Sequence, residues 1–155
     1  DHRDLHLSIR RQRQMCIRDS EEAVADLDRA IRIDSQVAAT RYKRATSLVE
    51  LGRYLQALED FDAAIMLDKG YSEAYVNRGA LLATLEQFNK ALEDFDSAIR
   101  INPRDGDAYA NRSLVLALMG RDEDAMEDLE IAIGLGYDRE YLEQRLAGIK
   151  SRRSS

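Results

Sequence analysis

The stretch Asn89–Pro103, NKALEDFDSAIRINP, decides the fold of this chain. Its apolar residues follow the three-and-four spacing of one helical face, and the closing proline disfavours a helical conformation in the residue before it. The pattern recurs with a fixed period of 34 residues, in four copies that each contain an early alanine. These alanines are Ala23, Ala57, Ala91 and Ala125. A period of this length predicts a repeat protein in which each unit is one supersecondary motif.

A second helical segment lies between successive copies, so the sequence predicts an all-α chain of antiparallel helix pairs. Gly52 and Gly120 are placed to make the tight turn within a pair, because glycine tolerates the left-handed backbone conformation. Glu86 stands at the same place in the middle pair, and we expect Ser72 to cap the helix that it begins. The expected helices are 21–33, 36–51, 54–67, 72–85, 88–101, 107–119, 122–135 and 138–149.

This pattern resembles the tetratricopeptide repeat family over residues 21–149. The family places a small residue, an aromatic residue, an alanine and a proline along its second helix, and residues 88–103 match all of them. The other copies depart where Lys69 and Tyr137 replace the proline and where Leu129 replaces the aromatic residue. The resemblance implies an α-solenoid, in which helix pairs stack in a right-handed superhelix and the first helices line a concave groove.

The family also has a close-packed small residue in the first helix of each pair. Gly79 fits this position, and Ala45 and Ser113 are acceptable there. The resemblance divides the chain into a half repeat (21–35), three repeats (38–69, 72–103 and 106–137), a C-terminal capping helix (138–149) and a disordered tail (150–155).

Residues 1–20 do not share the repeat pattern. The segment 10–19, RRQRQMCIRD, matches the translation of a transposase-type short-read sequencing adapter. The segment 1–6, DHRDLH, matches the outer end of the same kind of adapter in the same reading frame. The sequence therefore favours a non-native N-terminal segment, and a natural basic extension is the alternative. We expect residues 1–20 either to pack as a substitute helix or to stay loose.

The residue types after Glu21 argue against catalysis. This part of the chain has no His, no Cys and no Trp, and its carboxylates recur with the period, as structural contacts do. Neither a glycine-rich phosphate loop nor a metal-ligand spacing is present. We therefore expect no enzymatic activity, no catalytic residue, no cofactor and no metal.

Charge and hydropathy argue against two further classes of partner. Without the five Arg and three Asp of residues 1–20, the totals of 23 basic and 29 acidic residues fall to 18 and 26, a net charge of −8. This charge disfavours nucleic acid. No apolar run reaches the length of a membrane span and no signal peptide is visible, so we expect no membrane partner and a cytoplasmic location.

Arg44, Arg78 and Arg112 recur at one position of the period, and two interpretations compete. In the first, each arginine pairs with a repeated aspartate of a neighbouring helix and links the repeats. In the second, the arginines contact a bound acidic peptide. The matching series of aspartates favours the first, and it comprises Asp26, Asp60, Asp94 and Asp128.

The position before each of these arginines lies in the groove on the family's geometry. An asparagine there can donate and accept hydrogen bonds along an extended peptide backbone, and an ordinary solvated wall is the alternative. Some relatives grip a terminal carboxylate with a clamp of Lys, Asn and Arg, but Asp107 stands where a lysine would be needed, so we expect no clamp. The candidate groove residues are Tyr42, Lys43, Thr46, Val76, Asn77, Ala80, Asn111 and Leu114.

These features favour a non-catalytic protein–protein interaction scaffold that binds a partner peptide or helix in its concave groove. The alternative is an accessory repeat domain that is a fragment of a larger enzyme or of a secretion or assembly protein. A third hypothesis is a weak homodimer formed through uncapped apolar ends.

Overall fold

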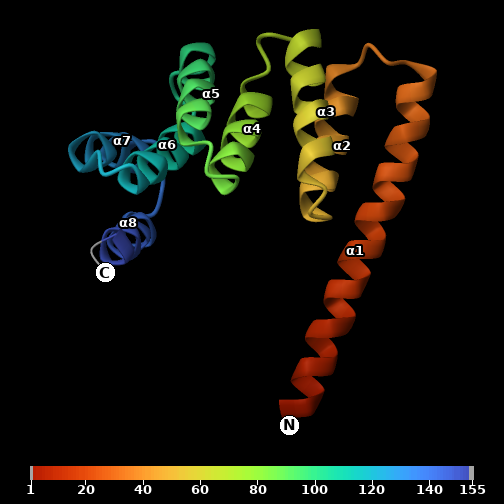
Figure 1. The fold of residues 1–155 in the computed structure, drawn as a ribbon, viewed down its shortest axis with the longest axis horizontal. Coiled ribbons are helices and arrows are strands. Elements are labelled where there is room, and N and C mark those ends of the chain that lie inside the picture. Colours follow the sequence, from red (N-terminus) through yellow and green to blue (C-terminus); the bar gives the residue numbers. More distant parts are fainter. Residues whose placement is uncertain (1, 154–155) are drawn as a thin grey trace. The chain divides into compact units, whose positions relative to one another are not determined.

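The computed structural model describes the backbone of residues 2–153 and the side chains of residues 12–153 (Figure 1). Over this part of the chain every regular element is an α-helix, which confirms the all-α class, and no helix there is long and apolar enough to cross a membrane. The helices are α1 (His2–Ile33), α2 (Ala38–Glu50), α3 (Tyr54–Leu67), α4 (Ser72–Thr84), α5 (Phe88–Ile101), α6 (Gly106–Leu118), α7 (Asp122–Gly134) and α8 (Arg139–Arg153).

The helices after α1 form the predicted antiparallel pairs. In Figure 1, α2 lies beside α3, α4 beside α5, and α6 beside α7. The chain divides into two compact units, residues 1–69 and 70–155. In the first unit α1 packs on α2, and in the second unit α6 contacts α4, α5 and α8. The period therefore predicted the pairing correctly, and the bounds of α3 and α5 match the expected ones.

The turn within each pair repeats in detail. Gly52, Glu86 and Gly120, each 34 residues apart, have φ angles of 72°, 59° and 81°. The backbone N–H of the following residue reaches back to close the helix, as Arg53 donates to the Leu48 carbonyl at 2.8 Å. The equivalent bonds after Glu86 and Gly120 are both 2.9 Å long. One hydrogen-bond pattern thus ends all three first helices.

Each pair buries the small–aromatic–small positions that the sequence predicted for the second helix. Their side chains are 0% exposed in α3, α5 and α7. The small residue opposite them is as important: a Cβ on Gly79 would lie 2.8 Å from Cε1 of Phe95. The close approach of α4 to α5 therefore requires glycine. The buried residues are Ala57, Phe61, Ala64, Ala91, Phe95, Ala98, Ala125, Leu129 and Ala132.

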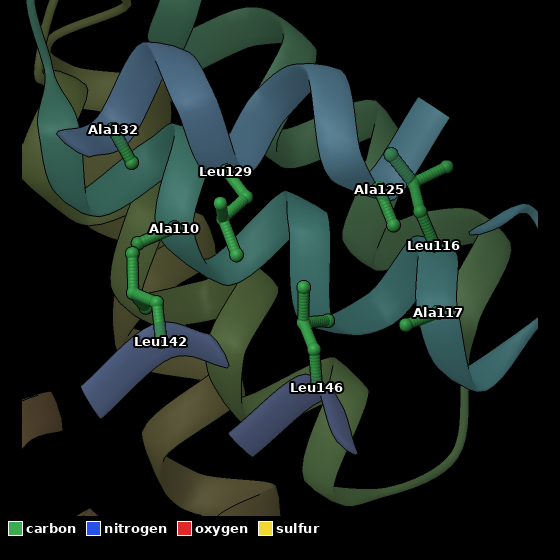
Figure 2. Close-up of a cluster of buried hydrophobic side chains, with 8 residues drawn as sticks. All are labelled: Ala110, Leu116, Ala117, Ala125, Leu129, Ala132, Leu142 and Leu146. Atoms are coloured by element: carbon green, nitrogen blue, oxygen red, sulfur yellow. The ribbon is translucent and has the colours of Figure 1, made fainter. Parts of the chain in front are cut away.

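The last helix, α8, closes the core of the second unit. Leu142 and Leu146 are 1% and 3% exposed, and Figure 2 shows both pointing toward α6. Apolar burial is the main stabilising contribution of such a contact. The cluster comprises Ala110, Leu116, Ala117, Ala125, Leu129, Ala132, Leu142 and Leu146.

The first helix departs from the period. A turn would be expected near Arg18, which lies 34 residues before Gly52, but α1 continues through it as one helix. Residues 12–19 have exposed side chains, so this part of α1 does not pack as a substitute helix against 21–33. The segment 2–11 continues the same helix, and its side chains lie outside the described residues.

Two further expectations were wrong. Ser72 is not an N-cap: Tyr71 holds that position, and the buried Ser72 hydroxyl donates instead to the Ala98 carbonyl at 3.3 Å. The tail expected to be disordered from residue 150 is helical through Arg153, because Arg153 donates to the Ala117 carbonyl and to Asp122. Residues 154–155 lie outside the described residues.

Candidate protein-interaction site

The repeated arginines lie between helices and bind the repeated aspartates. Arg44 of α2 donates from Nε and Nη2 to the two carboxylate oxygens of Asp60 on α3, both at 2.6 Å. Arg78 and Arg112 make the same bidentate pair with Asp94 and Asp128, at 2.6 to 2.8 Å. We call these pairs the arginine ladder. Its geometry confirms the structural interpretation of the repeated charges.

The remaining donor of a ladder arginine can link one repeat to the previous one. Arg44 Nη1 lies 2.5 Å from Asp28 on α1, and Arg112 Nη1 lies 2.6 Å from Asp96 on α5. The hydrogen bonds that Arg44 donates to Asp60 and Asp28 outweigh burial and raise its pKa, and those that Arg112 donates to Asp128 and Asp96 do the same for Arg112. These guanidinium groups are therefore charged and fully engaged in structure.

In the first unit, the candidate groove residues on α2 differ in accessibility. Tyr42 is half-buried and its ring centroid lies 6.0 Å from that of Phe61, so it belongs partly to the core of the helix pair. Lys43 is exposed. Thr46 is half-buried, and its hydroxyl donates to the Lys43 carbonyl at 2.8 Å. Lys43 is the one of these three with an exposed charge.

In the second unit, Asn77 of α4 and Asn111 of α6 are both half-buried. The amide of Asn111 donates to the Asp107 carbonyl one turn earlier, at 2.9 Å, which uses one of its two N–H donors. Ala80 and Leu114 are half-buried beside them. Val76 is only 6% exposed, so it offers a ligand little surface.

The same row continues onto α8, which the sequence reasoning missed. Arg145 lies 34 residues after Asn111, and Tyr141 lies 34 residues after Asp107. Both side chains are exposed, and Arg145 donates to the Tyr141 hydroxyl at 2.9 Å with its guanidinium 5.8 Å from the ring centroid. The period itself could have identified this pair, had it been extended past the last complete repeat.

One carboxylate on this face is electrostatically unusual. Burial, with a contribution from the charge of Asp105, raises the pKa of Asp107. Asp105 is fixed in place because it caps α6 by accepting from the Ala108 N–H, and because the Ser72 hydroxyl donates to it at 3.1 Å. The start of α6 is therefore an acidic part of the face. Among the described residues, no group of three His, Cys, Asp or Glu side chains could hold a metal ion.

Comparison with protein families identifies the chain. Two family models, each described as tetratricopeptide repeat, match residues 17–71 and 72–105, which together are more than half of the chain. The chain belongs to the tetratricopeptide repeat family. It is therefore a repeat module of the protein-interaction class, built as an α-solenoid of helix pairs.

Solved structures share this fold. MamA from Desulfovibrio magneticus RS-1, residues 41 to the end, is 25% identical over 94% of this chain and 83% of that chain, with a TM-score of 0.77. The first TPR of Spaghetti (RPAP3), bound to the HSP90 peptide SRMEEVD, is 22% identical over 79% and 97% of the two chains, with a TM-score of 0.70.

The chain spans only part of some relatives. In a further crystal structure of MamA, 22% identical with a TM-score of 0.70, the match covers 75% of this chain but 63% of that chain. A comparison with the curated proteins finds no match.

Proposed function

We propose that this chain is a non-catalytic scaffold that holds an extended peptide on the face formed by α4 and α6, through Asn77 and Asn111. The observation that carries the proposal is that two neighbouring positions of the first helix have different roles: one binds an aspartate of the same pair, and the other carries a partly exposed amide. Arg78 and Arg112 are committed to Asp94 and Asp128, whereas the residue just before each arginine is a half-buried amide.

An amide row suits a peptide backbone better than a charged side chain would. Each asparagine can accept from a backbone N–H and donate to a backbone carbonyl, so it orients a peptide without demanding a particular sequence. Two such residues on helices that contact each other would grip two points of one extended segment. The first TPR of Spaghetti (RPAP3), which has a similar fold, is bound to the HSP90 peptide SRMEEVD in its solved structure, and this supports a peptide as the ligand.

The charges on this face favour a peptide other than an acidic one. Asp107 stands beside Asn111, and the charge of Asp105 acts on it, so a further negative charge would be repelled at this end of α6. We therefore expect a neutral or mixed segment near α6, with any acidic residue directed toward the exposed guanidinium of Arg145.

A peptide-library selection against the full chain, followed by fluorescence anisotropy, tests the site. We expect Asn77→Ala and Asn111→Ala each to weaken binding of the selected peptides about tenfold, because each removes an amide that hydrogen-bonds the peptide backbone in the proposed complex. Asn89→Ala is the matched control, since Asn89 is exposed on α5 and lies outside this face. Unchanged affinity in both groove variants would exclude the assignment.

A further inference from the structure

Three exposed residues of α8 share one side of the helix, because they lie four and three positions apart. They are Tyr141, Arg145 and Gly148, and we call them the α8 face. Arg145 lies 34 residues after Asn111, so the α8 face extends the row on which the proposed peptide lies. Since α6 and α8 contact each other, one extended segment can reach both helices.

The guanidinium of Arg145 is held in place without a carboxylate. Its Nη1 donates to the Tyr141 hydroxyl at 2.9 Å, and its central carbon lies 5.8 Å from the centroid of that ring. The carboxylates nearest in sequence are engaged elsewhere, since Glu140 accepts from a glutamine and Glu143 binds Arg139. Over the residues whose side chains the structure describes, no carboxylate pairs with Arg145, so its remaining N–H groups are available to a ligand.

A similar stacked pair occurs twice more in the chain, and there it binds a carboxylate. Arg78 lies over the ring of Tyr75 at 5.6 Å, and Arg112 lies over the ring of Tyr109 at 5.5 Å. Both guanidinium groups also bind an aspartate of their own helix pair. Arg145 has the same stacked geometry and is exposed, so the charge that complements it is a negative charge from a ligand.

Gly148 has no packing reason to be glycine. Inside a helix glycine is less favourable than alanine. At Gly79 the close approach of α5 explains the residue, but among the described residues a Cβ on Gly148 would meet no atom within 4 Å. The backbone of α8 is therefore open one turn beyond Arg145, and close approach of a ligand is a common use of glycine.

We propose that the α8 face selects peptides that carry an internal acidic residue. The side-chain carboxylate would bind Nε and Nη2 of Arg145, and the peptide chain would continue across Gly148. The open backbone at Gly148 favours an internal residue over a chain terminus, because the peptide has room to pass beyond Arg145. This inference rests on the proposed function, since it concerns the ligand of the amide row formed by Asn77 and Asn111.

The test begins with a random peptide library fused through its C-terminus, so that the library presents carboxylates only on side chains. Selection against the full chain should enrich Asp or Glu at one position, and selection against Arg145→Gln should lose that enrichment. A selected peptide is then amidated, labelled and measured by fluorescence anisotropy. We expect Arg145→Gln in the chain, or the acid-to-amide change in the peptide, to weaken binding at least tenfold, and both together to weaken it no further.

Two further variants isolate the site. Gly148→Leu fills the open position and should weaken binding about tenfold, whereas urea denaturation should show no loss of stability, because leucine is a good helix former. Arg100→Gln is the charge-matched control: Arg100 is exposed on α5, outside the α8 face, and its loss should leave binding unchanged.

The outcomes separate this proposal from the proposed function. Weaker binding in Asn77→Ala and Asn111→Ala, with none in Arg145→Gln, would exclude the α8 face and keep the amide row. The opposite result would keep the acidic contact and exclude the amide row. The proposal is also overturned if no acidic residue is enriched, if Gly148→Leu binds equally well, or if a peptide cut after the acidic residue, with a free terminal carboxylate, binds more tightly.

Discussion

At the scale of single residues, the turn positions show how much strain one side chain can add. Glu86 adopts the left-handed conformation that Gly52 and Gly120 adopt at the same place in their pairs. A residue with a Cβ pays roughly 1 to 2 kcal/mol for this conformation, whereas glycine does not. The middle pair therefore forms its turn against a local preference, and packing around the turn compensates for it.

We expect Glu86→Gly to raise the free energy of unfolding by about 1 kcal/mol, because it removes that strain. Urea denaturation followed by circular dichroism measures the change. Gly120→Ala is the reverse control and should lower stability by a similar amount. The nearest atom to a Cβ on Gly120 is 3.7 Å away, so the backbone conformation alone would be responsible. A destabilised Glu86→Gly variant would contradict this account.

Residue types predicted the buried positions well and the accessibility of the groove less well. A period of 34 places Val76 and Asn77 side by side on one helix, but only packing decides that Val76 is buried and Asn77 is half-buried. The sequence likewise gave no sign that Ser72 would bond to a carbonyl 26 residues away rather than cap its own helix. Contacts between distant elements settle such details.

At the scale of elements, α8 is held at both ends by arginines. Arg139 donates to both carboxylate oxygens of Glu130 on α7 at 2.8 Å, and Arg153 donates to Asp122 at 2.6 and 3.1 Å. Hydrogen bonds from Arg139 and Arg153 lower the pKa of Glu130 and of Asp122 respectively. The sequence did not predict the last turn of α8, because its basic residues follow no periodic pattern. Only the structure shows that Asp122 lies opposite Arg153.

We expect α8 to loosen in acid. A carboxylate whose pKa is lower in the folded state stabilises that state above its unfolded pKa, about 4, and the contribution is lost as the pH falls through the folded value. Backbone NMR shifts of residues 139–153, followed from pH 7 to pH 2, should therefore begin to change below about pH 4.

The variant Arg139→Gln/Arg153→Gln is the control for this titration. Without the two guanidinium groups, protonation of Glu130 and Asp122 breaks no ion pair to α8, so most of the acid-induced change in the NMR chemical shifts of residues 139–153 should disappear. A titration of α8 identical in the variant and the parent chain would show that other groups govern the helix.

At the scale of the whole molecule, Arg44 and Arg112 of the arginine ladder each bind an aspartate of their own pair and one on the preceding helix, α1 and α5 respectively. The stability of a repeat array is approximately the sum of repeat and nearest-neighbour contributions. Arg112 contributes to both, since it binds Asp128 within its own pair and Asp96 on α5. A change at this residue should therefore affect more than its own helix.

We expect Arg112→Ala to lower the free energy of unfolding by roughly 3 kcal/mol, because it leaves the buried Asp128 carboxylate without its cation. Arg121→Ala is the control: Arg121 and its partner Asp124 are 53% and 48% exposed, and such a surface pair contributes less than about 1 kcal/mol. Urea denaturation of both variants compares them directly. If both variants lose the same unfolding free energy, the pair of Arg112 with Asp128 contributes no more to stability than an exposed surface pair does.

The arginine ladder does not continue into α8, because Leu146 occupies the position 34 residues after Arg112. In α1, Asp26 presents a carboxylate that an arginine of a further helix could neutralise. In α8, Leu146 stands at the arginine position and is buried. An arginine from a further first helix could therefore bind Asp26, whereas Leu146 provides no arginine for a further aspartate. Fusing further helix pairs after α8 would therefore not extend the chain of ion pairs, whereas supplying one helix before Glu21 would.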